Sequence, residues 1–166
     1  MTVRITPRGT RGTKPPGFAR PIMNLLAKPY TAAVRRPGSK MRVAGQPLLV
    51  LRTIGASSGR ERETVLGYWP DESQHDGSLL VIGSNMGAAV HPAWLFNMAR
   101  HPDQVWVERD GQRTRVEPET LEGAERLTFW ATVVSRNARY GKYQEQTDRE
   151  IPVVRLRPVA ETSRGA

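Results

Sequence analysis

The sequence predicts a mainly β fold, a small β-barrel with helical additions, in one domain. Six short apolar or alternating runs follow closely along a chain of 166 residues, a length that suits a single hydrophobic core. No helical pattern separates the first three runs, which favours antiparallel pairing over a doubly wound parallel sheet. Closely spaced strands in this number favour a sheet closed on itself, so we expect a barrel.

Each expected strand is an apolar or alternating run bounded by turn residues. The runs lie at 47–54, 64–69, 79–84, 105–109, 112–116 and 151–156. Asp110-Gly111 stands between the fourth and fifth runs and is typical of a tight hairpin with a primed turn. These two runs are therefore expected to pair directly.

Helices are expected at 92–100, 122–136 and 140–146, where apolar residues recur at helical spacing. A further amphipathic helix is expected at 21–36, with a kink at Pro29 and a basic flank that includes Arg35 and Arg36. This helix either packs against the domain or rests on a membrane surface.

The basic charge is concentrated in the first third of the chain. Residues 1–60 hold 12 Lys and Arg and no acidic residue, whereas 61–166 hold 13 basic and 16 acidic residues, which gives the net charge of +9. We predict a disordered basic arm at 1–20, an amphipathic helix and basic linker at 21–45, the barrel at 46–160 and a disordered tail at 161–166. The basic excess is either a solvated tail or an attraction to nucleic acid, anionic lipid or a phosphorylated ligand. Nucleic acid is not the expected partner, because few aromatic residues lie among the arginines.

Several chemistries are excluded. The chain has no cysteine, so it has no disulfide and no thiolate metal site. His75, His91 and His101 lack the spacing of metal ligands, and we expect no resident metal. No GxSxG, GxGxxG or P-loop motif is present. No apolar run reaches the ~18 residues of a membrane span, and the basic start lacks a signal-peptide pattern, so we expect a cytoplasmic protein.

Three segments carry candidate binding residues, and each also has a purely structural explanation. The turn GASSGRER (55–62) either presents backbone N–H groups and arginines to a phosphate or is a solvated hairpin turn. The segment GSNMGAAVHPAWLFNM (83–98) either offers N–H groups and the face of Trp94 to a planar ligand or buries Trp94 in the core. In RYGKYQEQTDREIPVV (139–154), Tyr140 and Tyr143 share one helix face and either line a pocket or pack.

Together these segments resemble the deazaflavin-dependent nitroreductase family, the coenzyme F420-dependent quinone and nitro reductases of mycobacteria and related actinobacteria. The resemblance spans residues 48–158 and includes LLVLRTIGASSGRER, the HPAW loop and helix, LEGAERLTFW and YGKYQEQTDREIPVVRLRP. It implies a split β-barrel of the FMN-binding type. It also implies an oxidoreductase that transfers a hydride from reduced F420 to a quinone, an activated alkene or a nitroaromatic compound.

The resemblance also implies roles for particular residues. Ser84 and Tyr143 stand where the family places groups that contact the substrate, and either could donate to it as negative charge develops. Contacts with the cofactor are implied for Ala56, Ser57, Ser58, Arg60, Arg62, Glu63, Thr64, Val65, Ile82, Gly83, Ser84, Asn85, Ala93, Trp94, Leu95, Phe96, Asn97 and Tyr140.

The turn departs from the family pattern, which usually has one or two basic residues where this chain has Ala56-Ser57-Ser58. Arg60, Arg62 and Arg52 are the cations nearest in sequence that could replace this charge. Three alternatives stay open: a split barrel that binds FMN, one that binds haem or a lipid, and a non-catalytic cofactor binder. The chain is expected to be a monomer or a homodimer. Residues 21–36 are the candidate for peripheral contact with the inner face of the cell membrane.

Overall fold

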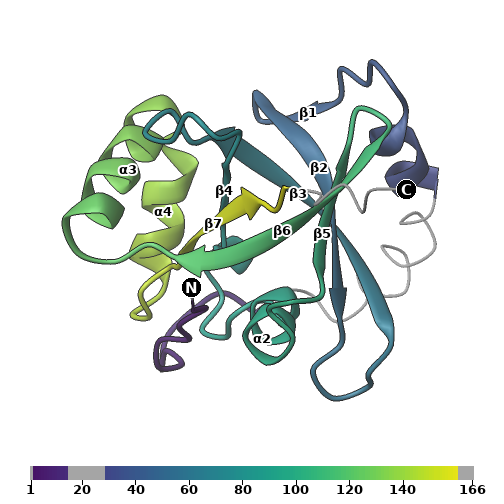
Figure 1. Ribbon diagram of the computed structural model, residues 1–166. Coiled ribbons are helices and arrows are strands. Elements are labelled where there is room, and N and C mark those ends of the chain that lie inside the picture. The colour runs from purple at the N-terminus through teal and green to yellow at the C-terminus, as the bar shows by residue number, and fades with distance from the viewer. Residues whose placement is uncertain (1, 15–28, 161–166) are drawn as a thin grey trace, which may run out of the picture.

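The computed structural model describes residues 2–14 and 29–160, and it confirms the predicted barrel. Strands β2 to β7 are all paired antiparallel, in the order β2-β3-β4-β7-β6-β5, and the pairing of β5 with β2 closes the barrel (Figure 1). The strands are β2 (Gln46–Ile54), β3 (Glu61–Pro70), β4 (Leu79–Ile82), β5 (Val105–Arg109), β6 (Gln112–Thr120) and β7 (Val153–Pro158). A short strand β1 (Arg42–Val43) pairs with the start of β2, inside the segment expected to be a linker.

The core lies inside the barrel because alternate residues of each strand point to its interior. On β2, Leu49 and Leu51 are fully buried among side chains from the other strands, while Leu48 and Val50 point outward. Helix α2 (Ala93–Arg100) closes one end of the barrel with Trp94, Leu95 and Met98. The helix predicted from spacing at 92–100 is therefore confirmed, and its large apolar residues belong to the core.

Helices cover part of the outer face of the sheet (Figure 1). Helices α3 (Gly123–Arg136) and α4 (Arg139–Gln146) lie beside β4 and β7, where Ile82, Val133 and Ile151 form a second apolar cluster. Residues 29–35 are helical and pack Val34 onto the outer face of β2. Residues 21–28 of the helix expected at 21–36 lie outside the described residues, as does the tail at 161–166.

The hairpin turn between β5 and β6 is the one that the sequence predicts. Asp110 and Gly111 both have positive φ, 51° and 75°, as a primed turn requires. Strand β6 runs on to Thr120, beyond the predicted end at 116. Within the described residues, no helix is long and apolar enough to cross a membrane.

The prediction of a disordered arm at 1–20 is wrong for residues 2–14, which we call the N-terminal strap. Val3 is buried in the barrel core, and Thr13 forms a parallel bridge with Ala88. A Cβ on Gly12 would lie 2.1 Å from the Ala89 nitrogen, so only glycine permits this approach. The strap is held by specific backbone contacts that composition alone does not reveal.

Candidate functional site

The turn that joins β2 to β3 does not form the predicted anion-binding nest. The N–H group of Ala56 donates to Asn97 Oδ1 at 2.9 Å, and those of Ser58 and Gly59 donate to the Gly55 carbonyl. The Arg60 N–H points back to Ser58 Oγ. Because these N–H groups donate within the protein, an anion at the tip would meet hydroxyl and guanidinium groups instead.

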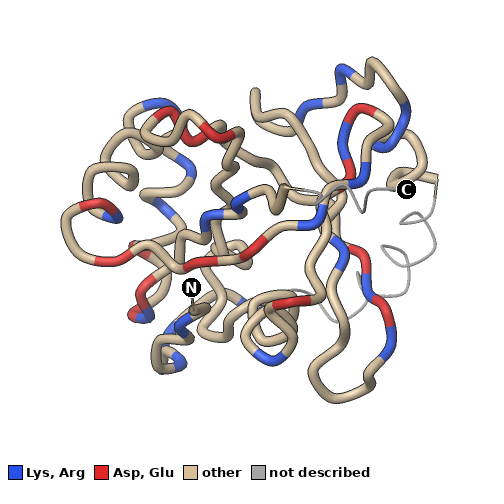
Figure 2. Tube along the Cα trace, viewed as in Figure 1, with Lys and Arg blue, Asp and Glu red and all other residues tan. Residues whose placement is uncertain are grey.

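The charged residues near this tip fall into two groups according to their ion pairs. Figure 2 shows where basic and acidic residues lie along the chain. Arg52 is taken up by ion pairs with Glu61, Glu63 and Glu108, so it does not replace the missing cation of the turn. Glu63 also pairs with Arg35 from the helix at 29–35, which makes it part of this network on the outer face of the sheet.

Arg60 and Arg62 form the second group. Within the described residues neither has an ion pair with a carboxylate, and Arg62 Nη2 donates only to Ser58 Oγ, at 3.3 Å. Ser57, Ser58 and Arg60 are exposed. The tip thus presents two uncompensated cations and two hydroxyl groups to an anion.

Helix α2 supports the turn through a single polar residue. Asn97 is 7% exposed, and its Nδ2 donates to Thr53 Oγ1 at 3.0 Å while its Oδ1 accepts from the Ala56 N–H. Trp94 and Leu95 lie in the core, so the face of Trp94 is not offered to a ligand. Ala93 and Phe96 are exposed, and the Phe96 ring meets His91 edge-on.

On β3, the predicted contacts Thr64 and Val65 point to opposite faces. Thr64 is paired with Leu51, which faces the barrel interior, whereas Val65 packs under Val34 on the outer face. A strand residue and its successor cannot line the same surface through their side chains.

The loop after β4 has an unusual backbone. Asn85 and Met86 both have positive φ, 45° and 54°, and form a short helical turn, η1 (Asn85–Gly87). Such conformations cost free energy in non-glycine residues and persist where surrounding contacts enforce them. The Asn85 side chain supplies one such contact, since its Nδ2 donates to the Val90 carbonyl. Ser84 is half-buried directly before this turn.

Arg149 supplies the main support for this loop, and sequence reasoning missed it. The side chain is 2% exposed, and its guanidinium donates to the carbonyls of Gly83, Ser84 and Ala88 at 2.7–3.0 Å. Its Nη1 lies 3.2 Å from His91 Nδ1. Burial lowers the pKa of Arg149, and within the described residues no carboxylate pairs with it. The only signal for it was an arginine shortly before the buried strand expected at 151–156.

His91 links this arginine to the N-terminal strap. Its Nδ1 accepts from Arg149, so the ring proton lies on Nε2, which donates to the Thr6 carbonyl at 2.9 Å. Burial lowers the pKa of His91 from 6.5, and the charge of Arg149 lowers it further. The neutral ring therefore fits both contacts.

The strap is also tied to Asp148. This carboxylate accepts from the N–H groups of Thr10 and Arg11 and from the Thr10 hydroxyl. These bonds, the hydroxyl contact first, hold the pKa of Asp148 at about 2. Thr13 adds a bond from its N–H to the Gly87 carbonyl. The strap, the loop after β4 and the residues just before β7 thus form one hydrogen-bonded network around Ser84.

Tyr140 and Tyr143 of α4 pack against Ile82, with their rings 6.1 Å apart and nearly perpendicular. Burial raises the pKa of Tyr140, so its phenol stays protonated, and it donates to Gln46 Oε1 at 2.7 Å. Gln46 was not among the predicted site residues. A lone glutamine at the start of an apolar strand was the only signal for it.

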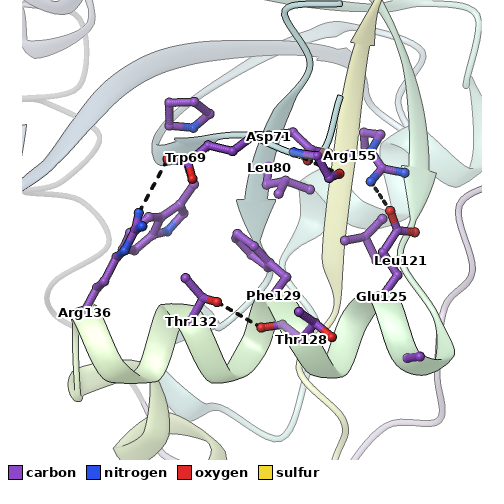
Figure 3. Close-up of a pocket in the computed structure, with 14 residues that line it drawn as sticks. Trp69, Asp71, Leu80, Leu121, Glu125, Thr128, Phe129, Thr132, Arg136 and Arg155 are labelled. Carbon is purple, nitrogen blue, oxygen red and sulfur yellow. Dashed lines mark hydrogen bonds and ion pairs between the residues drawn. The ribbon is translucent and has the colours of Figure 1, made fainter. Parts of the chain in front are cut away.

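The structure therefore gathers several of the predicted residues into two places and leaves others in the core or on the outer face of the sheet. The turn residues and Asn97 meet at one end of the β2–β3 hairpin, and Ile82, Tyr140 and Tyr143 meet where α4 contacts η1. A separate cavity of about 420 Å³ lies between α3 and the sheet, with Trp69 and Phe129 on its walls and the ion pair of Arg155 with Asp71 beside it (Figure 3). It contains none of the predicted site residues.

Known proteins are similar to this chain over most of its length. The profile of the F420H(2)-dependent quinone reductase family matches residues 25–158. An F420H(2)-dependent quinone reductase of Mycobacterium tuberculosis (strain ATCC 25618 / H37Rv) is 35% identical over 121 residues, which cover 69% of this chain and 76% of that protein.

Two solved structures share the fold with similar coverage. The structure of the F420-H2 dependent reductase FDR-A has a TM-score of 0.55 at 31% identity and covers 70% of this chain and 98% of that one. A structure described as a domain-swapped dimer has a TM-score of 0.57 at 26% identity and covers 84% of this chain and 99% of that one. The matched range contains the hairpin turn, the Ser84 loop and helix α4, and on this evidence the chain belongs to the F420H(2)-dependent quinone reductase family.

Proposed function

We propose that this protein catalyses the reduction of a quinone-class acceptor by the reduced deazaflavin F420H2. The observation that carries the proposal is the family match across 25–158, which includes every segment from which candidate site residues were drawn. Of the alternative ligands, FMN is kept as an outcome of the test below.

The hairpin tip fits the phosphate-bearing side of the cofactor. Arg60 and Arg62 lack carboxylate partners within the described residues, and the hydroxyl groups of Ser57 and Ser58 stand beside them. Anion binding therefore does not require the breaking of an existing ion pair. Asn97 holds the turn in place from α2.

Once bound, the reduced deazaflavin would supply the hydride. The protein positions the reactants and excludes water, and no strong catalytic acid or base is needed. In this proposal Ser84 and Tyr143 donate hydrogen bonds to the acceptor oxygen as it gains charge. Each bond lowers the activation free energy of the reduction by about 3 kcal/mol. Arg149 holds the Ser84 backbone, so the hydroxyl is presented from a fixed position.

The test mixes protein with F420H2 and a naphthoquinone and follows the return of oxidised F420 absorbance. We expect turnover by the wild type and a loss of about 10²-fold in kcat for Ser84→Ala or Tyr143→Phe. Ser135→Ala, a matched change at an exposed position of α3, should leave the rate unchanged. Tight binding of FMN with no binding of F420 would refute the proposal, and wild-type rates in both site variants would refute the donor assignment.

The proposal extends to a cytoplasmic enzyme that acts at the membrane surface, because many quinones are lipid-soluble. Residues 29–35 pack Val34 onto the barrel, so membrane contact would come from exposed Arg36 and from 21–28, outside the described residues. The full chain should float with anionic liposomes, and Lys28→Gln/Arg36→Gln should float less. Equal flotation of both proteins would end this part of the proposal.

For the oligomeric state we propose a homodimer over the monomer. The solved structure described as a domain-swapped dimer, at 26% identity, supports it. Light scattering after size exclusion should give twice the chain mass of 18.5 kDa. A single species at the chain mass would leave the monomer as the functional form.

A further inference from the structure

Gln46 begins β2 on the outer face of the barrel. Its side chain lies over Gly67 of β3, where a Cβ would meet Gln46 Oε1 at 3.1 Å and Gln46 Cδ at 3.4 Å. The residue is only 7% exposed. A glutamine is rarely buried to this degree, because its amide has two donors and an acceptor to satisfy.

Only part of this hydrogen-bonding capacity is used. The Tyr140 hydroxyl donates to Gln46 Oε1 at 2.7 Å, and this bond fixes the orientation of the amide. The Nε2 group is buried and has no partner within the described residues. Buried donors without an acceptor are uncommon in proteins, and an unmade bond of this kind favours any ligand that supplies the acceptor.

The neighbourhood places this donor beside the candidate site. Tyr140 packs in the same cluster as Ile82 and Tyr143. Trp69 belongs to that cluster too, and its indole N–H also lacks an acceptor within the described residues. Trp69 is two residues from Gly67 on β3, so the two share the outer face of the sheet. Two unmatched donors on one face point to a ligand that carries acceptor oxygens.

We propose that Gln46 is a ligand-binding residue whose side-chain amide donates to a ring carbonyl oxygen, with Tyr140 as the positioning residue that aims it. The inference rests on the proposed function, because a planar ring with carbonyl oxygens is common to the deazaflavin and to a quinone. It adds a residue outside the set implied by the family resemblance. The two sources of the carbonyl are separated by experiment.

The experiment has a binding arm and a kinetic arm. The binding arm titrates each protein with oxidised F420 in the absence of an acceptor and follows deazaflavin fluorescence. The kinetic arm measures kcat and KM for a naphthoquinone at saturating F420H2. The variants are Gln46→Leu, which removes the amide, and Gln46→Glu, which keeps an oxygen for Tyr140 and replaces the donor by an acceptor. Gln112→Leu is the matched control at an exposed position in the β5–β6 hairpin.

We expect Gln46→Leu and Gln46→Glu to weaken binding of the ligand that supplies the carbonyl about tenfold, which is about 1.4 kcal/mol. A rise in the F420 dissociation constant assigns the carbonyl to the deazaflavin. A rise in the quinone KM, with kcat and F420 binding nearly unchanged, assigns it to the acceptor. Tyr140→Phe should weaken the same constant, and Gln46→Leu/Tyr140→Phe should be no weaker than Gln46→Leu alone, because both changes remove one unit.

A merely structural role predicts that binding weakens only where the fold is destabilised. The double variant Gln46→Leu/Tyr140→Phe separates the two effects. It replaces both hydrogen-bonding partners by apolar groups, so its thermal midpoint should stay close to that of the wild type while binding is still weakened. The proposal is overturned if the wild type binds F420 and reduces the quinone while Gln46→Leu changes neither constant by more than about twofold. The proposal is also overturned if Gln46→Glu has the same F420 dissociation constant and the same quinone KM as the wild type. A wild type that binds no F420 refutes the proposed function itself, and this inference with it.

Discussion

Replacement of Arg149 by methionine removes the guanidinium and keeps most of the side-chain volume. In the native protein this group donates to the carbonyls of Gly83, Ser84 and Ala88 and meets His91 Nδ1, all while it is 2% exposed. Arg149→Met leaves these acceptors buried without donors. It also releases the backbone of the loop in which Asn85 and Met86 have positive φ.

The magnitude follows from two opposing contributions. Hydrogen bonds from a charged donor contribute about 1.5–3 kcal/mol each, so four contribute roughly 6–12 kcal/mol before desolvation is counted. Burial of a guanidinium without a carboxylate costs several kcal/mol, on the order of half of that gain. We therefore expect Arg149→Met to lower the free energy of unfolding by about 3–6 kcal/mol, a large part of a typical total.

Urea denaturation followed by tryptophan fluorescence measures this loss. Arg149→Lys keeps the charge, but its single ammonium cannot reach acceptors on Gly83 and Ala88 together, so it should fall between wild type and Arg149→Met. The kcat for quinone reduction should fall in parallel, because the Ser84 hydroxyl is no longer held in one place. An Arg149→Met protein within about 0.5 kcal/mol of wild type would refute the assignment of Arg149 as the support of the loop.

Four further predictions concern residues around this loop and the hairpin turn. The pKa of His91 is lowered from 6.5 in the folded state. The contribution of His91 to stability is therefore complete above about pH 6.5 and is lost as the pH falls through the folded pKa. His91→Gln should remove this pH dependence in urea titrations at about pH 5–7. The pKa of Asp148 is about 2 rather than 3.8, so its contribution is present above about pH 4 and is lost toward pH 2, and Asp148→Asn should flatten that acid limb and speed proteolysis within the strap. Asn97→Ala leaves the Ala56 N–H without its acceptor and should cost about 1–3 kcal/mol in unfolding experiments, with a weaker affinity for F420. Ser57→Lys adds a cation at the exposed tip, so it should tighten F420 binding and make that binding more sensitive to salt; unchanged affinity at low salt would contradict the tip as the anion site.

Much of the barrel could be predicted because its strands are encoded locally. Leu49 and Leu51 alternate with outward residues along β2, and Asp110-Gly111 specifies its own turn. The end of β6 at Thr120 was not predicted, and the additional stretch contains Pro118. There β6 pairs only with β7, since its pairing with β5 stops at Arg115, so proline stands in a stretch with one free edge.

The site was less predictable because its geometry depends on contacts between distant residues. A Gly- and Ser-rich turn has the composition of a nest, but Asn97, 41 residues away, takes one of its N–H groups. Trp94 had two possible environments at the sequence level, and the position of α2 across the barrel end decided for the core. The roles of Gln46 and Arg149 depend on partners that lie far away in the sequence. Gln46 is bonded to Tyr140, and Arg149 to carbonyls of the loop after β4.

The N-terminal strap also has a consequence for the order in which the protein is made. Residues 2–14 leave the ribosome before the strands of the barrel, yet the carboxylate that accepts from Thr10 lies 138 residues later in the chain. Contacts of such long sequence separation form late, after local hairpins have paired. The nascent strap therefore has no place to dock until β4 and the residues just before β7 have been synthesised. The N-terminal strap therefore packs onto the Ser84 loop late in folding. The barrel forms before the region proposed to bind the acceptor is complete.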